Sequence, residues 1–132
     1  MKTIIAGSRD FNDYEMLKEY IQQSLFKISE VVCGGAKGVD DLGLKWAIDN
    51  NKNLKIFMAD WKVYGKSAGP IRNKQMAHYC DQGLIICNNK SPGSINMIDN
   101  MVKLNKPYFV VHLKDMQPVQ IVKNNSIIFQ GS

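Results

Sequence analysis

The chain has 132 residues, of which 45% are hydrophobic and 22% are charged, and it carries a formal net charge of +5. This composition is typical of one soluble globular domain with a sizeable core. No apolar run approaches the roughly 20 residues that span a bilayer, and the apolar stretch after Met1 is too short for a signal peptide, so we expect a cytoplasmic protein without a membrane segment.

The positive charge suggests nucleic-acid binding, but its distribution does not favour that function. The lysines are spread along the chain without forming a run, and no aromatic residues alternate with them as on a base-stacking surface. A mildly basic surface suits a small anionic ligand equally well.

The cysteines predict neither disulfides nor a metal site. Cys33, Cys80 and Cys87 are odd in number and lack the spacing of metal ligands. We therefore expect buried free thiols in a reducing compartment and no bound metal. We also expect no cofactor.

Strand-like and helix-like segments alternate from the N-terminus onward. Residues 3–6 (TIIA) predict a buried strand, and residues 14–27 predict a helix, because apolar side chains recur there at helical spacing as far as Leu25. A second strand over 30–33 (EVVC) and a second helix over 39–50 repeat the pattern.

The alternation continues after the second helix. Residues 54–58 (LKIFM) predict a third strand, and a polar loop over 59–68 leads to a helix that opens at Gly69–Pro70, where proline suits the first turn. Residues 83–87 (GLIIC) predict a fourth strand.

The last helix and the tail complete the pattern. A helix over 94–105 is expected to bury Met101 and Val102, and residues 108–113 (YFVVHL) predict a fifth strand. The tail over 113–132 predicts a hairpin that turns at Asn124–Asn125 and forms either an antiparallel sheet edge or an oligomer contact.

Alternating strands and helices imply an α/β fold with parallel strands. We expect a single domain over 1–132, built as a Rossmann-like three-layer sandwich with a mostly parallel sheet of about five strands and a C-terminal β-hairpin. The apolar strands agree, because parallel sheets are buried on both faces.

Arginine is rare in this chain and lies only in loops marked by glycine. Against fifteen lysines the sequence has two arginines, Arg9 in AGSRDF and Arg72 in GKSAGPIRN. Arginine grips phosphate or carboxylate with a planar fork of donors, which lysine lacks. We interpret the pair as anion-binding groups at one site.

Four loops follow the expected strands, and parallel strands bring their carboxyl ends to one edge of the sheet, where ligands bind in open α/β folds. The ligand-binding residues that we predict in these loops are Gly7, Ser8, Arg9 and Asp10; Gly34, Gly35, Ala36, Gly38 and Asp40; Trp61, Lys66, Ser67, Gly69, Pro70, Arg72 and Asn73; and Ser91, Gly93, Ser94 and Asn96.

The residue types suggest roles, several of them with alternatives. Gly93 and Ser94 open a helix, whose free N–H groups and positive dipole end favour phosphate. Asp40 either accepts ribose hydroxyls or caps a helix. Trp61 either stacks on a base or packs under its loop. His78, expected on a helix surface, and His112, within a strand, receive no catalytic role.

Taken together, the segments IIAGSRDF, VVCGGAKGVDDLGLKWA, ADWKVYGKSAGPIRNKQMA and SPGSINMI, over about residues 3–100, resemble the SLOG superfamily. This superfamily includes the SMF/DprA DNA-processing proteins and the lonely-guy phosphoribohydrolases, and the chain is most similar to its small, single-domain YspA-like group. The resemblance implies a Rossmann-like fold, a nucleotide or nucleotide-derived ligand, and a homo-oligomer, either a dimer or a tetramer.

The resemblance also exposes a departure. In the phosphoribohydrolase branch, an arginine and the glutamate of a P-G-G-x-G-T-x-x-E pattern serve the cleavage of an N-glycosidic bond. By resemblance Arg72 falls at the arginine, Gly93–Ser94 at the G-T pair and Met97 at the glutamate. An oxocarbenium-like transition state needs a nearby carboxylate, which methionine does not supply.

We therefore expect a protein that binds an ADP-ribose-like or cyclic nucleotide signal without turnover, as a sensor or as a sequestering sponge such as the viral antagonists of bacterial immunity. The alternative is a nucleotide N-glycosidic hydrolase that uses Arg72 and takes its carboxylate from Asp10, Asp40 or Asp41. A DNA-associated protein is the third hypothesis.

Overall fold

The computed structural model describes residues 1–88 and 91–131. Its elements, in chain order, are β1 (Lys2–Gly7), α1 (Tyr14–Ser24), β2 (Glu30–Cys33), α2 (Val39–Asp49), β3 (Asn53–Ile56), α3 (Trp61–Tyr64), the 3₁₀ turn η1 (Gly65–Ser67), α4 (Ala68–Tyr79), β4 (Gln82–Asn88), α5 (Pro92–Lys103), β5 (Tyr108–Lys114), β6 (Gln117–Lys123) and β7 (Ser126–Gln130).

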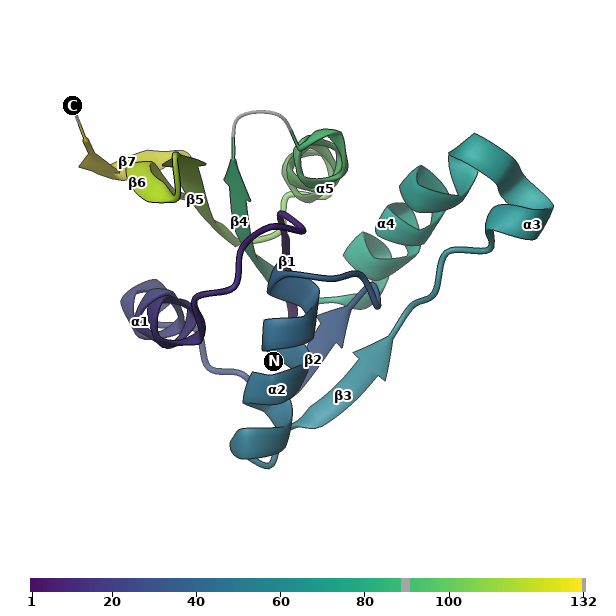
Figure 1. The fold of residues 1–132 in the computed structure, drawn as a ribbon, viewed down its shortest axis with the longest axis horizontal. Coiled ribbons are helices and arrows are strands. Elements are labelled where there is room, and N and C mark those ends of the chain that lie inside the picture. Colours follow the sequence, from purple (N-terminus) through teal and green to yellow (C-terminus); the bar gives the residue numbers. More distant parts are fainter. Residues whose placement is uncertain (89–90, 132) are drawn as a thin grey trace.

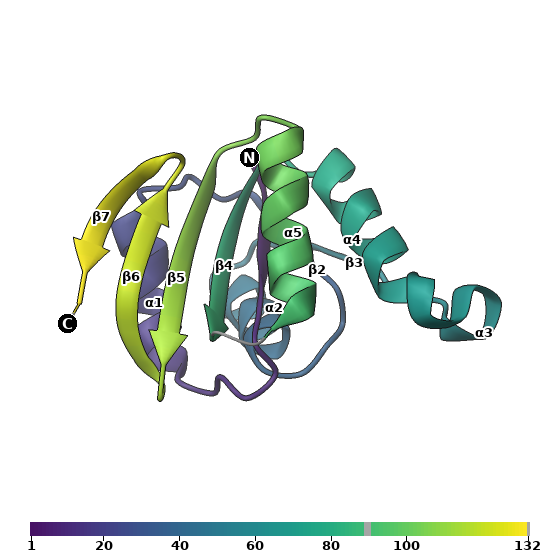
Figure 2. The same ribbon diagram turned by 90° about the horizontal axis from the view of Figure 1, so that it is seen from above.

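The strands form one sheet in the order β3-β2-β1-β4-β5-β6-β7. Neighbouring strands from β3 to β5 are parallel, and β6 and β7 add antiparallel pairs. Helices α1 and α2 cover one face of the sheet, and α4 and α5 cover the other (Figures 1 and 2). The predicted Rossmann-like α/β fold is confirmed.

The two faces of the sheet carry separate cores, and the central strands contribute to both. Ile5 and Leu84 pack toward α1 and α2, whereas Ile4 and Ile85 pack toward α4 and α5. All four side chains are fully buried. This burial on both faces explains why the strands read as continuous apolar runs rather than as alternating ones.

Helix α1 is shorter than predicted and ends at Ser24. Leu25 adopts a left-handed backbone conformation, with φ of 59°, and its N–H donates to the carbonyl of Gln22 at 3.1 Å. Because this cap turns the chain away, the Leu25 side chain is 80% exposed. The expectation that Leu25 belongs to the buried face was wrong.

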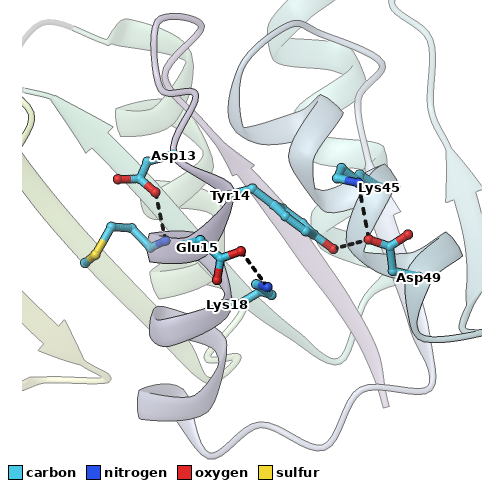
Figure 3. A network of polar contacts seen from close by, with 7 residues as sticks. Asp13, Tyr14, Glu15, Lys18, Lys45 and Asp49 are labelled. Atoms are coloured by element: carbon cyan, nitrogen blue, oxygen red, sulfur yellow. Dashed lines mark hydrogen bonds and ion pairs between the residues drawn. The ribbon is translucent and has the colours of Figure 1, made fainter.

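A polar network ties α1 to α2 (Figure 3). The Tyr14 hydroxyl donates to Asp49 Oδ2 at 2.7 Å, and Lys45 Nζ lies 3.4 Å from the same oxygen. Burial, followed by the bond to Asp49, raises the pKa of Tyr14 to about 12. The phenol therefore stays protonated at neutral pH and keeps its donor role between the helices.

Three other expected boundaries need correction. β3 covers 53–56 because β2 offers only four residues for pairing. The expected polar loop over 59–68 contains α3 and η1, which are too short to show a helical period and bury no side chain. Helix α5 begins at Pro92 with Ser91 as its N-cap residue, and Val102 is 53% exposed because Met97 and Met101 face the sheet instead.

The tail forms the predicted hairpin and turns at Asn124, whose φ is 57°. Of the two expected roles, the structure shows an antiparallel edge, because β6 pairs with β5 and β7 lies outermost. Leu113 belongs to β5, and Ser132, the last residue of the expected tail, lies outside the described residues. In the described part of the chain, no helix is long and apolar enough to cross a bilayer.

Lys106, which follows α5 in the sequence, caps the C-terminus of α4. Its ammonium group donates to the carbonyls of Ala77, His78 and Cys80 at 2.6, 2.9 and 2.7 Å. The final carbonyls of a helix have no partner within the helix, and a cation there also opposes the negative end of the helix dipole. Lys106 satisfies three such groups at once.

We expect Lys106→Met to lower the free energy of unfolding by about 1.5 kcal/mol, because charged hydrogen bonds to partly buried carbonyls are lost. Urea denaturation followed by circular dichroism measures this change. Lys103→Met is the matched control, since Lys103 is exposed, and it should leave stability within about 0.5 kcal/mol of the parent. Equal midpoints for the two variants would contradict the capping role.

Candidate ligand-binding site

A pocket of about 480 Å³ opens at the carboxyl edge of the parallel strands, between the loops after β1 and β2 and the first turns of α4 and α5. Most of the predicted ligand-binding residues line it: Gly7, Arg9, Gly34, Ala36, Asp40, Trp61, Gly69, Pro70, Arg72, Asn73, Ser91, Gly93, Ser94 and Asn96. The topology thus brings all four expected loops together.

The other predicted residues lie outside the wall of this pocket. Ser8 is buried, and its Oγ accepts the N–H of Asn88 at 2.9 Å. Asp10 accepts the amide of the same Asn88, at 3.1 Å to Oδ2. The remaining residues outside the wall are Gly35, Gly38, Lys66 and Ser67. Ser8 and Asp10 thus tie the loop after β1 to the end of β4.

Ala6, Met76, Pro92 and Met97 also line the wall but were not among the predicted ligand-binding residues, although the resemblance had placed Met97 at a glutamate position. Met76 lies one helical turn after Arg72, and Met97 lies one turn after Gly93, so helical spacing from the predicted residues was the available signal. Ala6 directly precedes the predicted Gly7 on β1. These residues make the pocket more apolar than the loops alone suggested.

Asp40 stabilises the glycine loop from within α2. Its side chain is 6% exposed, and Oδ2 accepts the N–H of Gly34 at 2.9 Å and, more weakly, the N–H of Ala36 at 3.5 Å. The N-cap residue of α2 is Gly38, so Asp40 does not cap the helix in the expected way. Burial raises the pKa of this carboxyl, although the loop N–H groups and Arg72 oppose the shift.

The loop needs glycine where it crosses the strand ends. Gly38 has a φ of 75°, and a Cβ there would lie 2.2 Å from the carbonyl oxygen of Ser8. This close approach lets the N–H of Val39 donate to the same carbonyl at 3.2 Å. The start of α2 is thereby fixed against the loop that carries Arg9.

Arg72 is half-buried and makes hydrogen bonds within the protein. Its Nη1 donates to the carbonyl of Gly34 at 2.6 Å, and its Nε donates to Asn73 Oδ1 at 3.2 Å. A Cβ on Gly34 would lie 2.6 Å from Nη1, so a larger residue there would displace the guanidinium from its present position.

Asn73 is buried between α4 and α5 and uses its whole amide. Its Oδ1 accepts Arg72 Nε, while its Nδ2 donates to the carbonyl of Gly93 at 3.0 Å and to Asn96 Oδ1 at 3.1 Å. Asn73 therefore connects the helices that form two walls of the pocket.

Arg9 differs from Arg72 in its surroundings. It is exposed at the pocket wall, and its guanidinium makes no hydrogen bond or ion pair with any residue in the ranges 1–88 and 91–131. Within this part of the chain, no protein group occupies the guanidinium N–H donors that an anion would use.

The first turn of α5 supplies further donors. Pro92 occupies the first position, where its missing N–H costs nothing. The hydroxyls of Ser91 and Ser94 lie 2.9 Å apart in one hydrogen bond. Free N–H groups and the positive dipole end of a twelve-residue helix favour an anionic group at this wall.

The rest of the wall is apolar. Met76 and Met97 are each 1% exposed and line the pocket from α4 and α5. Trp61, on α3, is 58% exposed, and its ring edge lies beside Gly69, where a Cβ would be 3.3 Å from Cη2. The indole therefore offers a flat apolar surface at the pocket. It does not pack under its loop, which was one of the two roles expected for Trp61.

Histidine and cysteine are absent from the described pocket wall. His78 is exposed on α4, and burial lowers the pKa of His112 on β5. Burial raises the pKa values of Cys33, Cys80 and Cys87 to about 11. Within the described residues, no group of three or more His, Cys, Asp or Glu side chains is placed to hold a metal ion.

We expect the native protein to resist a thiol reagent such as Ellman's reagent at pH 7.5. The three cysteines are buried, and thiols with such high pKa values provide little thiolate. Absorbance should show less than about 0.1 thiol per chain within minutes, and all three thiols after unfolding in guanidinium chloride. Rapid labelling of one native thiol would contradict this expectation.

Comparisons with known proteins identify the family of this chain. Residues 1–64 match the family described as YspA, cpYpsA-related SLOG family. The chain is 33% identical over 84 residues to the Gene 61 protein of Mycobacterium phage D29, and the match covers 57% of this chain and 66% of that protein. No solved structure matches significantly. The fold, the glycine loops at the carboxyl edge of the sheet and the family match together show that this chain belongs to the SLOG superfamily.

Proposed function

We propose that the protein binds a nucleotide-derived small molecule in this pocket and holds it without turnover. The observation that carries the proposal is the composition of the wall. It combines Arg9, which has no partner among the described residues, with the first turn of α5, the exposed ring of Trp61 and a methionine-lined interior.

The charges in the wall favour an anionic ligand. The described wall contains two arginines, Arg9 and Arg72, and one carboxylate, that of Asp40. Asp40 already accepts loop N–H groups, so the positive charge of Arg9 is left for the ligand. A phosphate or diphosphate beside Arg9 and Ser94 suits these donors.

The apolar surfaces favour a base and a sugar as the remainder of the ligand. Trp61 offers a stacking face, and stacking on an aromatic side chain tolerates any base. A volume of about 480 Å³ lies within the range of roughly 300–1,000 Å³ that small-molecule sites occupy. An ADP-ribose-like or cyclic nucleotide has the required combination of phosphate, sugar and base.

The proposal that the ligand is not turned over rests on where the carboxylates lie. Met97 lines the pocket at the position where the phosphoribohydrolase pattern has glutamate. Asp40 is held by the loop, and Asp10 and Asp41 lie outside the described wall. A hydrolase that stabilises an oxocarbenium-like state lacks a free carboxylate among these groups.

Two roles follow from binding alone, sensing and sequestration, and we propose sequestration in the cytoplasm. A relative of this chain, the Gene 61 protein, belongs to a phage. A small binding domain that removes a nucleotide signal would act as an antagonist of signalling immunity in an infected cell.

We also propose a homo-oligomer, on the resemblance to the superfamily. Large apolar side chains are exposed near the pocket on Ile56, Met58, Val63 and Tyr64, and an apolar surface of this kind is typical of interaction sites. Light scattering after size-exclusion chromatography tests this: a mass near 15 kDa, that of one chain, would contradict it.

A thermal shift assay with a panel of mononucleotides, ADP-ribose and cyclic nucleotides tests the function. A ligand at a hundredfold excess over its Kd adds about 2.7 kcal/mol to stability, which raises the Tm by several degrees. Chromatography of the same samples should show the stabilising compound unchanged. A released base or ribose phosphate would establish the hydrolase instead.

A further inference from the structure

The two arginines of the pocket are engaged differently, although their surroundings in the sequence are similar. Arg72 donates a hydrogen bond from Nη1 to the carbonyl of Gly34 and another from Nε to Asn73 Oδ1. Arg9 makes no such bond within the described residues. The difference indicates two separate roles.

Both hydrogen-bond partners of Arg72 make further hydrogen bonds to other parts of the site. The backbone of Gly34 makes two hydrogen bonds to side chains. Its N–H donates to Asp40, and its carbonyl accepts from Arg72. Asn73, the other partner, makes hydrogen bonds to Gly93 and Asn96. One chain of hydrogen bonds thus runs from α2 through the loop after β2 and through α4 to the first turn of α5.

The positive charge of Arg72 is also partly compensated by a carboxylate of the protein. Asp40 lies close enough that the guanidinium lowers the pKa of this carboxyl against the effect of burial. An anion near Arg72 would therefore meet a guanidinium with a carboxylate beside it, whereas Arg9 makes no ion pair within residues 1–88 and 91–131.

We propose that Arg72 is a positioning residue that holds the loop after β2, α4 and α5 in the arrangement that forms the pocket, and that Arg9 is the arginine that contacts the anionic group of the ligand. The assignment of Arg9 rests on the proposed function. The assignment of Arg72 does not require a ligand.

Hydrogen exchange on the ligand-free protein tests Arg72. Both Arg72→Gln and Arg72→Lys should speed amide exchange at Gly34 and at Ile95, in the first turn of α5, by more than about tenfold, because neither side chain can serve both acceptors. Arg9→Gln is the matched control and should change these rates less than about twofold. Wild-type exchange in Arg72→Lys, with its charge retained, would overturn the positioning role. If Arg72→Gln does not fold, Arg72→Lys decides.

Calorimetric titration with ADP-ribose at two salt concentrations tests Arg9. Arg9→Gln should weaken binding more than about tenfold and reduce its salt dependence, because a direct charge contact is lost. Arg72→Lys should weaken binding while keeping the wild-type salt dependence. Unchanged binding by Arg9→Gln would overturn the Arg9 assignment alone. Absence of binding by the wild type would overturn that assignment together with the ADP-ribose form of the proposed function, and hydrogen exchange would still decide Arg72.

Discussion

Gly7→Ala is expected to destabilise the folded protein severely at 25 °C. A Cβ at Gly7 would lie 1.8 Å from the carbonyl oxygen of Ile86 and 2.9 Å from Val39 Cγ2. The first of these atoms is backbone in the neighbouring strand β4, so relief requires the central strands to separate. We expect a loss of about 4 kcal/mol or more, against a typical domain stability of 5–15 kcal/mol.

Urea denaturation followed by tryptophan fluorescence measures this effect. Gly93→Ala is the matched control, because a Cβ at Gly93 meets no atom within 4 Å, and its midpoint should stay close to that of the parent. A Gly7→Ala protein that unfolds at the parent's midpoint would show that β1 and β4 are not packed as described.

Asp40→Ala is expected to lower stability by about 3 kcal/mol. The substitution leaves the buried N–H of Gly34 and the partly buried N–H of Ala36 without their acceptor, and an unsatisfied buried donor costs about 1–3 kcal/mol. Asp41→Ala removes the same charge from an exposed position one residue further and should cost less than about 1 kcal/mol. Equal losses in the two variants, measured by urea denaturation, would contradict the role of Asp40 in the loop.

The same carboxyl predicts a pH dependence. Because burial raises the pKa of Asp40 above its ordinary value of 3.8, the folded state binds this proton more tightly than the unfolded state. The contribution of Asp40 to stability therefore falls as pH rises from 3.8 through the raised pKa. Relative to Asp40→Asn, which does not titrate, the parent should lose stability with rising pH in this window, as parallel urea titrations would show. A rise of the parent relative to Asp40→Asn would contradict the direction of the shift.

The fold was predictable because its determinants are local. The central residues of strands such as β1 (Lys2–Gly7) and β4 (Gln82–Asn88) are buried on both faces, so their sequences are continuous apolar runs bounded by loops. Once the strands are parallel, the loops after them must share one edge, which is why most predicted ligand-binding residues line one pocket. The positions of Leu25 and Val102 were missed because cap geometry and helix rotation, rather than spacing, determine their exposure.

The roles of individual polar residues were less predictable, because they depend on long-range contacts. Arg72 reaches a carbonyl 38 positions away in the sequence, and Asn73 bridges to Asn96 on another helix. No local pattern distinguishes such an arginine from Arg9. Asp40 was correctly placed at the edge of the sheet, but the loop that it holds emerges only from the three-dimensional structure.

Native mass spectrometry of the purified protein, incubated with a library of nucleotides and cyclic nucleotides and then denatured, tests the central claim most directly. The proposed function predicts a stoichiometric complex whose ligand leaves unchanged on denaturation. Its abundance should fall sharply in the Arg9→Lys variant, because the proposed bidentate contact would become a single point contact. A bare protein mass across the whole library, or a complex that survives Arg9→Lys undiminished, would contradict the proposed site. A cleaved product would contradict binding without turnover.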